Sequence, residues 1–139
     1  MTALVGRVAL VTGAGRGIGR AVALMLAQSG CRVILCARTV EQLQAVEREI
    51  TNHNATACAL AADLTDDAAV QRLAAESRRI FGTVDVLINN AGWGKRAPVA
   101  KANIEDWDQT FRVNLRAPMM LARQFLPDMI AKGEGAVIN

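Results

Sequence analysis

Five short apolar runs, separated by longer segments with helical periodicity, constrain the fold of this 139-residue chain most strongly. Each run is too short for a buried helix and lacks the polar alternation of a half-exposed strand, which is typical of a strand covered on both faces. The expected strands are residues 8–11, 33–35, 59–61, 86–88 and 136–138. This alternation predicts an α/β fold, a doubly wound parallel sheet with helices on both faces.

Local signals place the first two helices between these strands. A helix from Ile18 to about Ser29 is expected to end at Gly30, because glycine is the preferred residue just past a helix C-terminus. A capping box of Thr39 and Gln42 predicts the start of the second helix. The buried positions of that helix share a helical spacing: Leu43, Val46 and Ile50.

Two more helices are expected after the third strand. Thr65 is predicted to cap the first of them, and three apolar residues should form its inner face: Val70, Leu73 and Ile80. Asn103, with Asp106, is predicted to cap the second. A stripe at helical spacing marks the inner face of that helix: Trp107, Phe111, Asn114 and Leu115. Pro118 is expected to kink the same helix, because proline lacks a backbone donor.

Composition argues against several function classes. The chain has no apolar run of the roughly 18 residues that a membrane span needs, and no secretory signal, so we expect a cytoplasmic protein without a membrane partner. Its 16 basic residues are scattered, so nucleic acid is not an expected partner. The three cysteines fit no zinc spacing, and His53 lies in a polar stretch, so no metal site is expected. The cysteines are Cys31, Cys36 and Cys58.

The clearest functional signal is the glycine-rich stretch at residues 12–19, between the first strand and the first helix. Glycine permits positive φ and leaves no Cβ in the way of a ligand. The N-terminus of the helix that follows offers free N–H groups and a partial positive charge to a pyrophosphate. This context favours a dinucleotide site over a tight turn without a ligand. The expected binding residues are Gly13, Gly15, Arg16, Gly17, Ile18 and Gly19.

Charge at the end of the second strand favours NADP over NAD. NAD-binding sites place an acid there for the ribose 2′-hydroxyl, whereas this chain has Ala37 followed by Arg38. Arg38 and Arg16 can both bind a 2′-phosphate, because guanidinium matches phosphate geometry. Two solvated surface arginines are the alternative interpretation.

The spacing of Gly13, Gly17 and Gly19, with Ile18 where the usual fingerprint has its last glycine, resembles the compact members of the short-chain dehydrogenase/reductase family. The resemblance implies a Rossmann-like sheet with strand order 3-2-1-4-5. Further motifs, in the family's order, extend it along the chain: Asp63 and Leu64, Asn89, Asn90, Ala91 and Gly92, and Asn114.

The same resemblance implies roles for these residues. Asp63 and Leu64 would bind adenine, and Asn89 would help to hold the central sheet together. The ribose and pyrophosphate would be lined by Asn90, Ala91 and Gly92. Asn114 matches the asparagine of the catalytic tetrad, which holds a water linked to the catalytic lysine. Without the resemblance, a hydrogen-bonded asparagine in the core is the favoured interpretation of Asn114.

Members of this family transfer a hydride between nicotinamide and a carbonyl or alcohol, with a tyrosine as general acid and base, assisted by lysine, serine and asparagine. The chain contains no tyrosine, and Asn139 falls just before the expected place of the serine. We therefore expect residues 1–139 to be an incomplete dinucleotide-binding domain, inactive alone, of a longer oxidoreductase. A non-catalytic, regulatory dinucleotide-binding module is the alternative, and a methyltransferase is disfavoured because no acid follows the second strand.

Substrate and oligomeric state are less constrained. The basic residues Lys95 and Arg96, after Trp93, would lie at the mouth of the site and suit an anionic or carrier-bound acyl substrate, or form a solvated loop. A ketone, a 3-oxoacyl thioester and a hydroxysteroid stay open, although the pattern is most similar to 3-oxoacyl-(acyl-carrier-protein) reductases. The family's long helix around residues 118–126 implies a homodimer or homotetramer, with ordinary packing on the sheet as the alternative.

Overall fold

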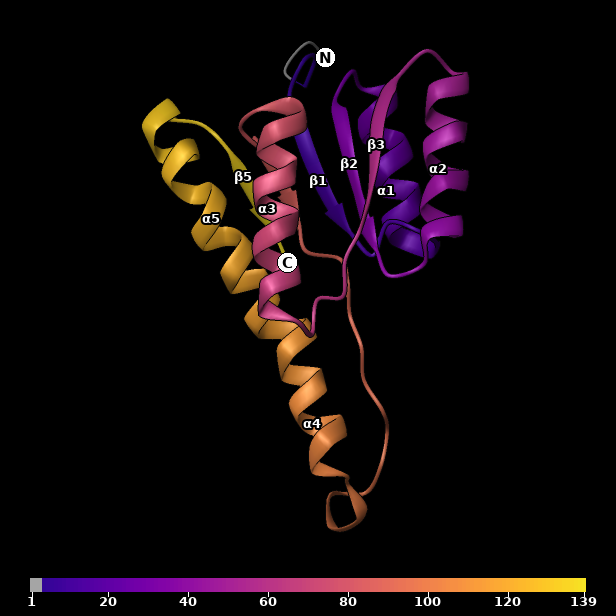
Figure 1. Cartoon of the computed structure of the whole chain (residues 1–139), viewed down its shortest axis with the longest axis vertical. Coiled ribbons are helices and arrows are strands. Elements are labelled where there is room, and N and C mark those ends of the chain that lie inside the picture. Colours follow the sequence, from indigo (N-terminus) through magenta and orange to yellow (C-terminus); the bar gives the residue numbers. More distant parts are fainter. Residues whose placement is uncertain (1–3) are drawn as a thin grey trace.

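The computed structural model describes residues 4–139, which form a five-stranded parallel sheet with helices on both sides (Figure 1). The strands are β1 (Val8–Thr12), β2 (Arg32–Ala37), β3 (Thr56–Ala61), β4 (Val86–Ile88) and β5 (Ala136–Ile138). Their order across the sheet is β3-β2-β1-β4-β5, and each neighbouring pair is parallel. The predicted fold class and strand order are confirmed.

The helices divide between the two faces of the sheet. They are α1 (Gly17–Gln28), α2 (Val40–Asn52), α3 (Asp67–Phe81), α4 (Ile104–Phe111) and α5 (Ala117–Lys132), with a 3-10 turn η1 (Val99–Lys101) and a π-helical turn η2 (Arg112–Arg116). Alternate residues of β1 point to opposite cores: Val8 and Leu10 pack with α3 and α5, whereas Ala9 and Val11 pack with α1 and α2. Both faces of the strand are therefore covered, as its uninterrupted apolar sequence predicts.

The helix ends agree with the sequence in part. Gly30 follows α1 with φ of 89°, and Cys31 N–H donates to the Leu26 carbonyl, a Schellman ending. Thr39 precedes α2 as predicted, but its side chain makes no capping bond. The prediction that Thr65 caps α3 is wrong. Asp66 does so, accepting from the Ala68 N–H, while the Thr65 hydroxyl is bonded to Asp63.

Most predicted buried faces are confirmed, but the stripe on the fourth helix is not. Leu43, Val46, Ile50, Val70 and Leu73 are buried, whereas Ile80 is only half-buried. The prediction that the stripe of α4 faces the core is wrong: Trp107, Phe111 and Leu115 are 58%, 46% and 61% exposed, and Asn114 is exposed as well. The physical reason is visible in Figure 1, where α4 projects past the end of the sheet and has no strand beneath it.

The break predicted near Pro118 takes another form. The chain stays helical from α4 to α5, but residues Arg112–Arg116 form a π-helical turn and Pro118 lies in the first turn of α5. Proline has no N–H to donate to the carbonyl four residues earlier, so the wider turn lies where regular hydrogen bonding would fail. After this turn the buried row continues as Ala117, Leu121, Phe125 and Met129.

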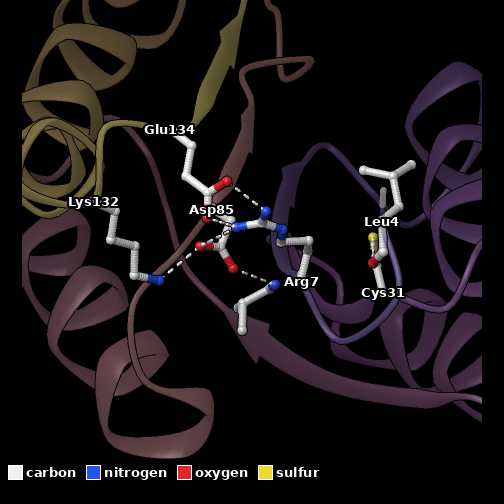
Figure 2. Close-up of polar contacts among 7 residues, drawn as sticks. Leu4, Arg7, Cys31, Asp85, Lys132 and Glu134 are labelled. Carbon is white, nitrogen blue, oxygen red and sulfur yellow. Dashed lines mark hydrogen bonds and ion pairs between the residues drawn. The ribbon is translucent and has the colours of Figure 1, made fainter. Parts of the chain in front are cut away.

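Asp85 lies where the strands begin, at the end of the sheet away from their carboxyl ends. Its contacts connect three segments of the chain (Figure 2). Its carboxylate accepts from the Val8 N–H at 2.9 Å and from Lys132 Nζ at 2.8 Å, and Arg7 lies 3.8 Å away and bonds Glu134. Burial by itself raises the pKa of Asp85, but the bonds from Lys132 and Val8 and the charges of Lys132 and Arg7 outweigh it, so the pKa lies below its ordinary value of 3.8. The ionised form is therefore the one that the fold stabilises.

We expect Asp85→Asn to lower the free energy of unfolding by about 1–3 kcal/mol at neutral pH, because it removes the charge of a carboxylate that is only 9% exposed and that accepts from both Lys132 and Val8. A depressed folded-state pKa means that this stabilisation is present above the unfolded value and is lost as the pH falls through the folded one. The difference between wild type and variant in urea unfolding should therefore shrink below pH 3.8. Asp108→Asn, at an exposed site, is the matched control; an equal effect of both variants would contradict the prediction.

The described part of the chain shows neither a membrane-spanning helix nor a metal-binding cluster. Among residues 4–139, no helix combines the length and apolar character that crossing a membrane requires. Within the same part of the chain, no group of three His, Cys, Asp or Glu side chains is placed to hold a metal ion. Cys36 is fully buried, and burial raises its pKa to about 12, so it is a core thiol and not a nucleophile.

Candidate functional site

A cleft of about 700 Å³ opens where β1, β2 and β4 end. β1 lies between β2 and β4, where the strand order reverses direction, and ligands of open α/β sheets bind at such a point. The residues that line it come from five separate parts of the chain: Gly13, Gly15, Arg16, Gly17, Ile18, Ala37, Arg38, Thr39, Gln42, Ala62, Leu64, Asn90, Ala91, Gly92, Trp93, Gln109 and Val113.

The glycine turn is held tightly against the loop after β4. Asn90 Nδ2 donates to the Thr12 carbonyl at 3.0 Å and to the Gly13 carbonyl at 3.3 Å. A Cβ at Gly19 would lie 2.2 Å from the Gly13 oxygen and 2.4 Å from Asn90 Nδ2. Real Cβ atoms do not approach so closely, so α1 can reach the turn only with glycine at this position. Gly19 therefore does not line the cleft, but its lack of a side chain lets α1 pack against the residues that do.

Gly17 has the opposite environment. Its φ is 55°, and apart from its chain neighbours and the backbone of α1, no atom of the described residues lies within 4 Å of the place where a Cβ would stand. It begins α1, whose N-terminus has no side-chain cap and no acid in its first turn. Free N–H groups and the positive end of the helix dipole are thus available to an anion in the cleft.

Two arginines from different elements add positive charge to the wall of the cleft. Arg16 precedes α1 and Arg38 follows β2. Neither forms an ion pair with a carboxylate of residues 4–139. The Arg38 charge acts on Asp63, whose pKa lies below its ordinary value, first because of the hydrogen bond from the Thr65 N–H and, to a smaller extent, because of Arg38.

The loop after β3 contributes an apolar wall. Ala62 and Leu64 line the cleft, whereas Asp63 is exposed and does not. Asp63 Oδ1 accepts from the Thr65 N–H at 2.9 Å and from its hydroxyl at 2.8 Å. Of the two residues predicted to bind adenine, Leu64 thus lines the cleft, whereas the Asp63 carboxylate is held in a turn outside it.

The asparagines after β4 have different positions. Asn89 lies on β5's side of the sheet: its N–H donates to the Ile138 carbonyl and its Nδ2 to Asn139 Oδ1, both at 2.8 Å. This contact ties β4 to β5. On the other side, the Ala91 N–H donates to the Thr12 hydroxyl at 3.0 Å. Asn90, Ala91 and Gly92 line the cleft between these contacts.

Asn114 lies in the π-helical turn and binds the backbone of Trp93 through both ends of its amide. Its Oδ1 accepts from the Trp93 N–H, and its Nδ2 donates to the Trp93 carbonyl, each at 2.8 Å. It does not line the cleft, but its Oδ1 lies 3.7 Å from the place of a Cβ on Gly92. The Asn114 side chain is therefore not in the core and does not bond its own helix. It fixes the loop that forms one end of the cleft.

The basic mouth is smaller than the sequence suggests. Lys95 Nζ pairs with Asp106 Oδ2 at 2.8 Å, so its charge is neutralised within the chain. Four other residues line the cleft although no sequence pattern predicted them as site residues: Gln42, Ala62, Gln109 and Val113. Gln109 and Val113 are four residues apart on one helical face, which is the signal that could have identified them.

The chain is similar in sequence and in structure to known oxidoreductases. A family described as short chain dehydrogenase matches residues 7–139. An uncharacterized oxidoreductase of Staphylococcus aureus strain USA300 is 33% identical over 139 residues, covering 100% of this chain and 59% of that relative. The crystal structure of a metagenomic short-chain oxidoreductase in complex with NADP is 46% identical, with a TM-score of 0.94 over 98% of this chain and 62% of that one.

L-Sorbose reductase from Gluconobacter frateurii, complexed with NADPH and L-sorbose, is 33% identical, with a TM-score of 0.91 over 96% of this chain and 51% of that one. The chain thus spans little more than half the length of these proteins. The match covers β1 to β5 and every part of the cleft. By its sequence, its strand order and its glycine turn, the chain belongs to the short-chain dehydrogenase family.

Proposed function

We propose that the cleft binds NADP(H) and that the chain is the cofactor-binding part of an oxidoreductase that acts on a carbonyl or alcohol. The observation that carries the proposal is the pair Arg16 and Arg38, which line the cleft without a carboxylate partner among residues 4–139. A 2′-phosphate would supply the missing anion, and guanidinium groups bind phosphate well. NADP in the metagenomic relative and NADPH in the sorbose reductase support this choice.

The residues of the cleft fit a dinucleotide. The space beside Gly17 and the uncapped start of α1 suit the pyrophosphate, and Leu64 and Ala62 offer an apolar surface to adenine. Asn90 holds the glycine turn in place, and Ala91 and Gly92 leave room for a ribose. The nicotinamide, when bound, supplies or accepts the hydride, while these residues bind and orient it.

The acid–base part of the reaction must come from elsewhere. Residues 1–139 include no tyrosine, and their one tetrad residue, Asn114, holds the Trp93 backbone. We propose that the serine, tyrosine and lysine belong to a part of the whole protein outside these residues. Residues 1–139 are then one dinucleotide-binding domain without its substrate-binding portion, inactive alone.

Calorimetric titration of the intact protein with NADP⁺ and NAD⁺ tests the proposal. We expect NADP⁺ to bind at least about tenfold more tightly, because hydrogen bonds to charged groups are worth roughly 1.5–3 kcal/mol each. NADP⁺ should also raise the melting temperature more than NAD⁺ does at equal concentration. Equal affinities would remove the role of Arg16 and Arg38, and no binding of either would refute the proposed function.

We further propose that a second copy of the protein covers the exposed apolar face of α4, η2 and α5. This face carries Trp107, Phe111, Leu115 and Met119 at four-residue intervals, all at least 46% exposed. Monomers rarely expose so many large apolar side chains together, and the family resemblance implies association through this helix. Light scattering should give a dimer or tetramer for the intact protein and a smaller species for Leu115→Arg. A wild type of single-chain mass would contradict the proposal.

A further inference from the structure

Two polar side chains at the start of α2 do not make the contacts that their sequence positions predict. A capping box would join the Thr39 side chain to the backbone of α2 and the Gln42 side chain to the Thr39 N–H. In the structure Thr39 makes no side-chain capping bond, and no hydrogen bond among residues 4–139 involves the Gln42 amide. Both residues line the cleft instead.

The position of Gln42 follows from its contact with Gly15. A Cβ on Gly15 would lie 2.9 Å from Gln42 Oε1, 3.1 Å from Gln42 Cβ and 3.7 Å from the Cβ of Ala37. Gly15 thus touches both the Gln42 side chain and the end of β2. Since Arg16 follows Gly15 and Arg38 follows Ala37, the Gln42 amide lies at the corner where the two guanidinium-bearing segments meet.

The charges around this corner favour an anion. Arg16 and Arg38 have no ion-pair partner among the described residues. Glu41 precedes Gln42 in the first turn of α2 but does not line the cleft. The carboxylate of Asp63 is bonded to Thr65. A neutral donor such as the Gln42 amide completes the corner without adding a negative charge.

We propose that Gln42 is a cofactor-recognition residue whose side-chain amide donates a hydrogen bond to the 2′-phosphate that Arg16 and Arg38 bind. The inference rests on the proposed function. The amide donates through Nε2, and its hydrogen bond to a charged phosphate is much stronger than one to a neutral 2′-hydroxyl. Gln42 therefore adds affinity for NADP while it leaves the binding of NAD nearly unchanged.

The test compares two substitutions in the intact protein, by calorimetric titration with NADP⁺, NAD⁺, 2′,5′-ADP and 5′-AMP. Gln42→Met keeps the length of the side chain but removes its donor, and should weaken NADP⁺ and 2′,5′-ADP about tenfold. Gln42→Glu sets a carboxylate against the phosphate and should weaken both on the order of 100-fold. NAD⁺ and 5′-AMP should change less than about twofold in either variant.

Gln44 offers the matched control, because it is an exposed glutamine on the same helix that does not line the cleft. Gln44→Met and Gln44→Glu should leave all four affinities within about twofold of wild type. Equal losses for NADP⁺ and NAD⁺ in the Gln42 variants would show that Gln42 only supports the glycine turn, and would overturn the inference. Unchanged NADP⁺ binding would overturn it too. Only a wild type that fails to bind NADP⁺ would overturn the proposed function itself.

Discussion

Gly19→Ala should destroy the dinucleotide site. The added methyl group would stand 2.2 Å from the Gly13 carbonyl oxygen and 2.4 Å from Asn90 Nδ2. Backbone on one side and a hydrogen-bonded amide on the other leave no flexible atom to give way, so either α1 or the loop after β4 must move. We expect a loss of about 1–3 kcal/mol in the free energy of unfolding. Affinity for NADP⁺ should fall at least about tenfold as well, because the displaced turn can no longer present its N–H groups.

Gly94→Ala provides the control for the same chemical change. Gly94 also lies in a loop near the cleft, but apart from its chain neighbours no described atom lies within 4 Å of its potential Cβ, and its φ is not in the left-handed region. This variant should unfold and bind NADP⁺ like the wild type, within about 0.5 kcal/mol. Urea unfolding and calorimetric titration measure both quantities. A Gly19→Ala protein with wild-type stability and affinity would show that the turn is more compliant than its contacts indicate.

Arg38→Ala should have the second large effect, on cofactor choice. It removes a guanidinium group that has no carboxylate partner among residues 4–139, so the fold should tolerate the loss. We expect NADP⁺ to bind roughly 10- to 100-fold more weakly, since charge-assisted bonds contribute about 1.5–3 kcal/mol, while NAD⁺ is nearly unaffected. Arg38→Asp should go further and make NAD⁺ the preferred ligand, because an acid at the end of β2 accepts from a 2′-hydroxyl and repels a phosphate.

Arg48→Ala is the matched control, because Arg48 is an exposed arginine on α2 that does not line the cleft. It tests whether a general loss of positive charge, and not the place of Arg38, weakens the binding of an anionic cofactor. Similar losses in Arg48→Ala and Arg38→Ala would mean that the preference arises from net charge. Equal weakening of NADP⁺ and NAD⁺ in Arg38→Ala would mean that Arg38 binds the pyrophosphate and not the 2′-phosphate.

Some of the site was accessible from sequence because it depends on residues close together in the chain. Ten of the twelve predicted cofactor-binding residues line the cleft, all but Gly19 and Asp63. Their placement follows from the strand-turn-helix order, since the carboxyl ends of parallel strands meet at one edge of a sheet. Whether these residues bind a cofactor is a prediction that the experiments above test.

Other parts of the site depend on contacts between distant segments, which periodicity cannot report. Asn114 pairs with the backbone of Trp93, 21 residues away, and Lys95 pairs with Asp106. The stripe at Trp107 and Phe111 has the spacing of a core face, but it becomes a surface because no strand lies under α4. Each of these contacts and exposures depends on which distant segment packs beside the residue, and not on the local sequence.

The sequence by itself determined the alternation of strands and helices, the two-sided burial of β1 and β2, and a glycine turn that opens α1, because these follow from side-chain periodicity and from the backbone freedom of glycine. Only the tertiary structure decided the positions and contacts of Gln42, Asn114 and the α4 stripe. The Thr39 and Gln42 side chains can either bond the backbone at the start of α2 as a capping box or point toward the cleft. Which of the two occurs depends on Gly15, which is distant in sequence and leaves the space that the Gln42 side chain fills.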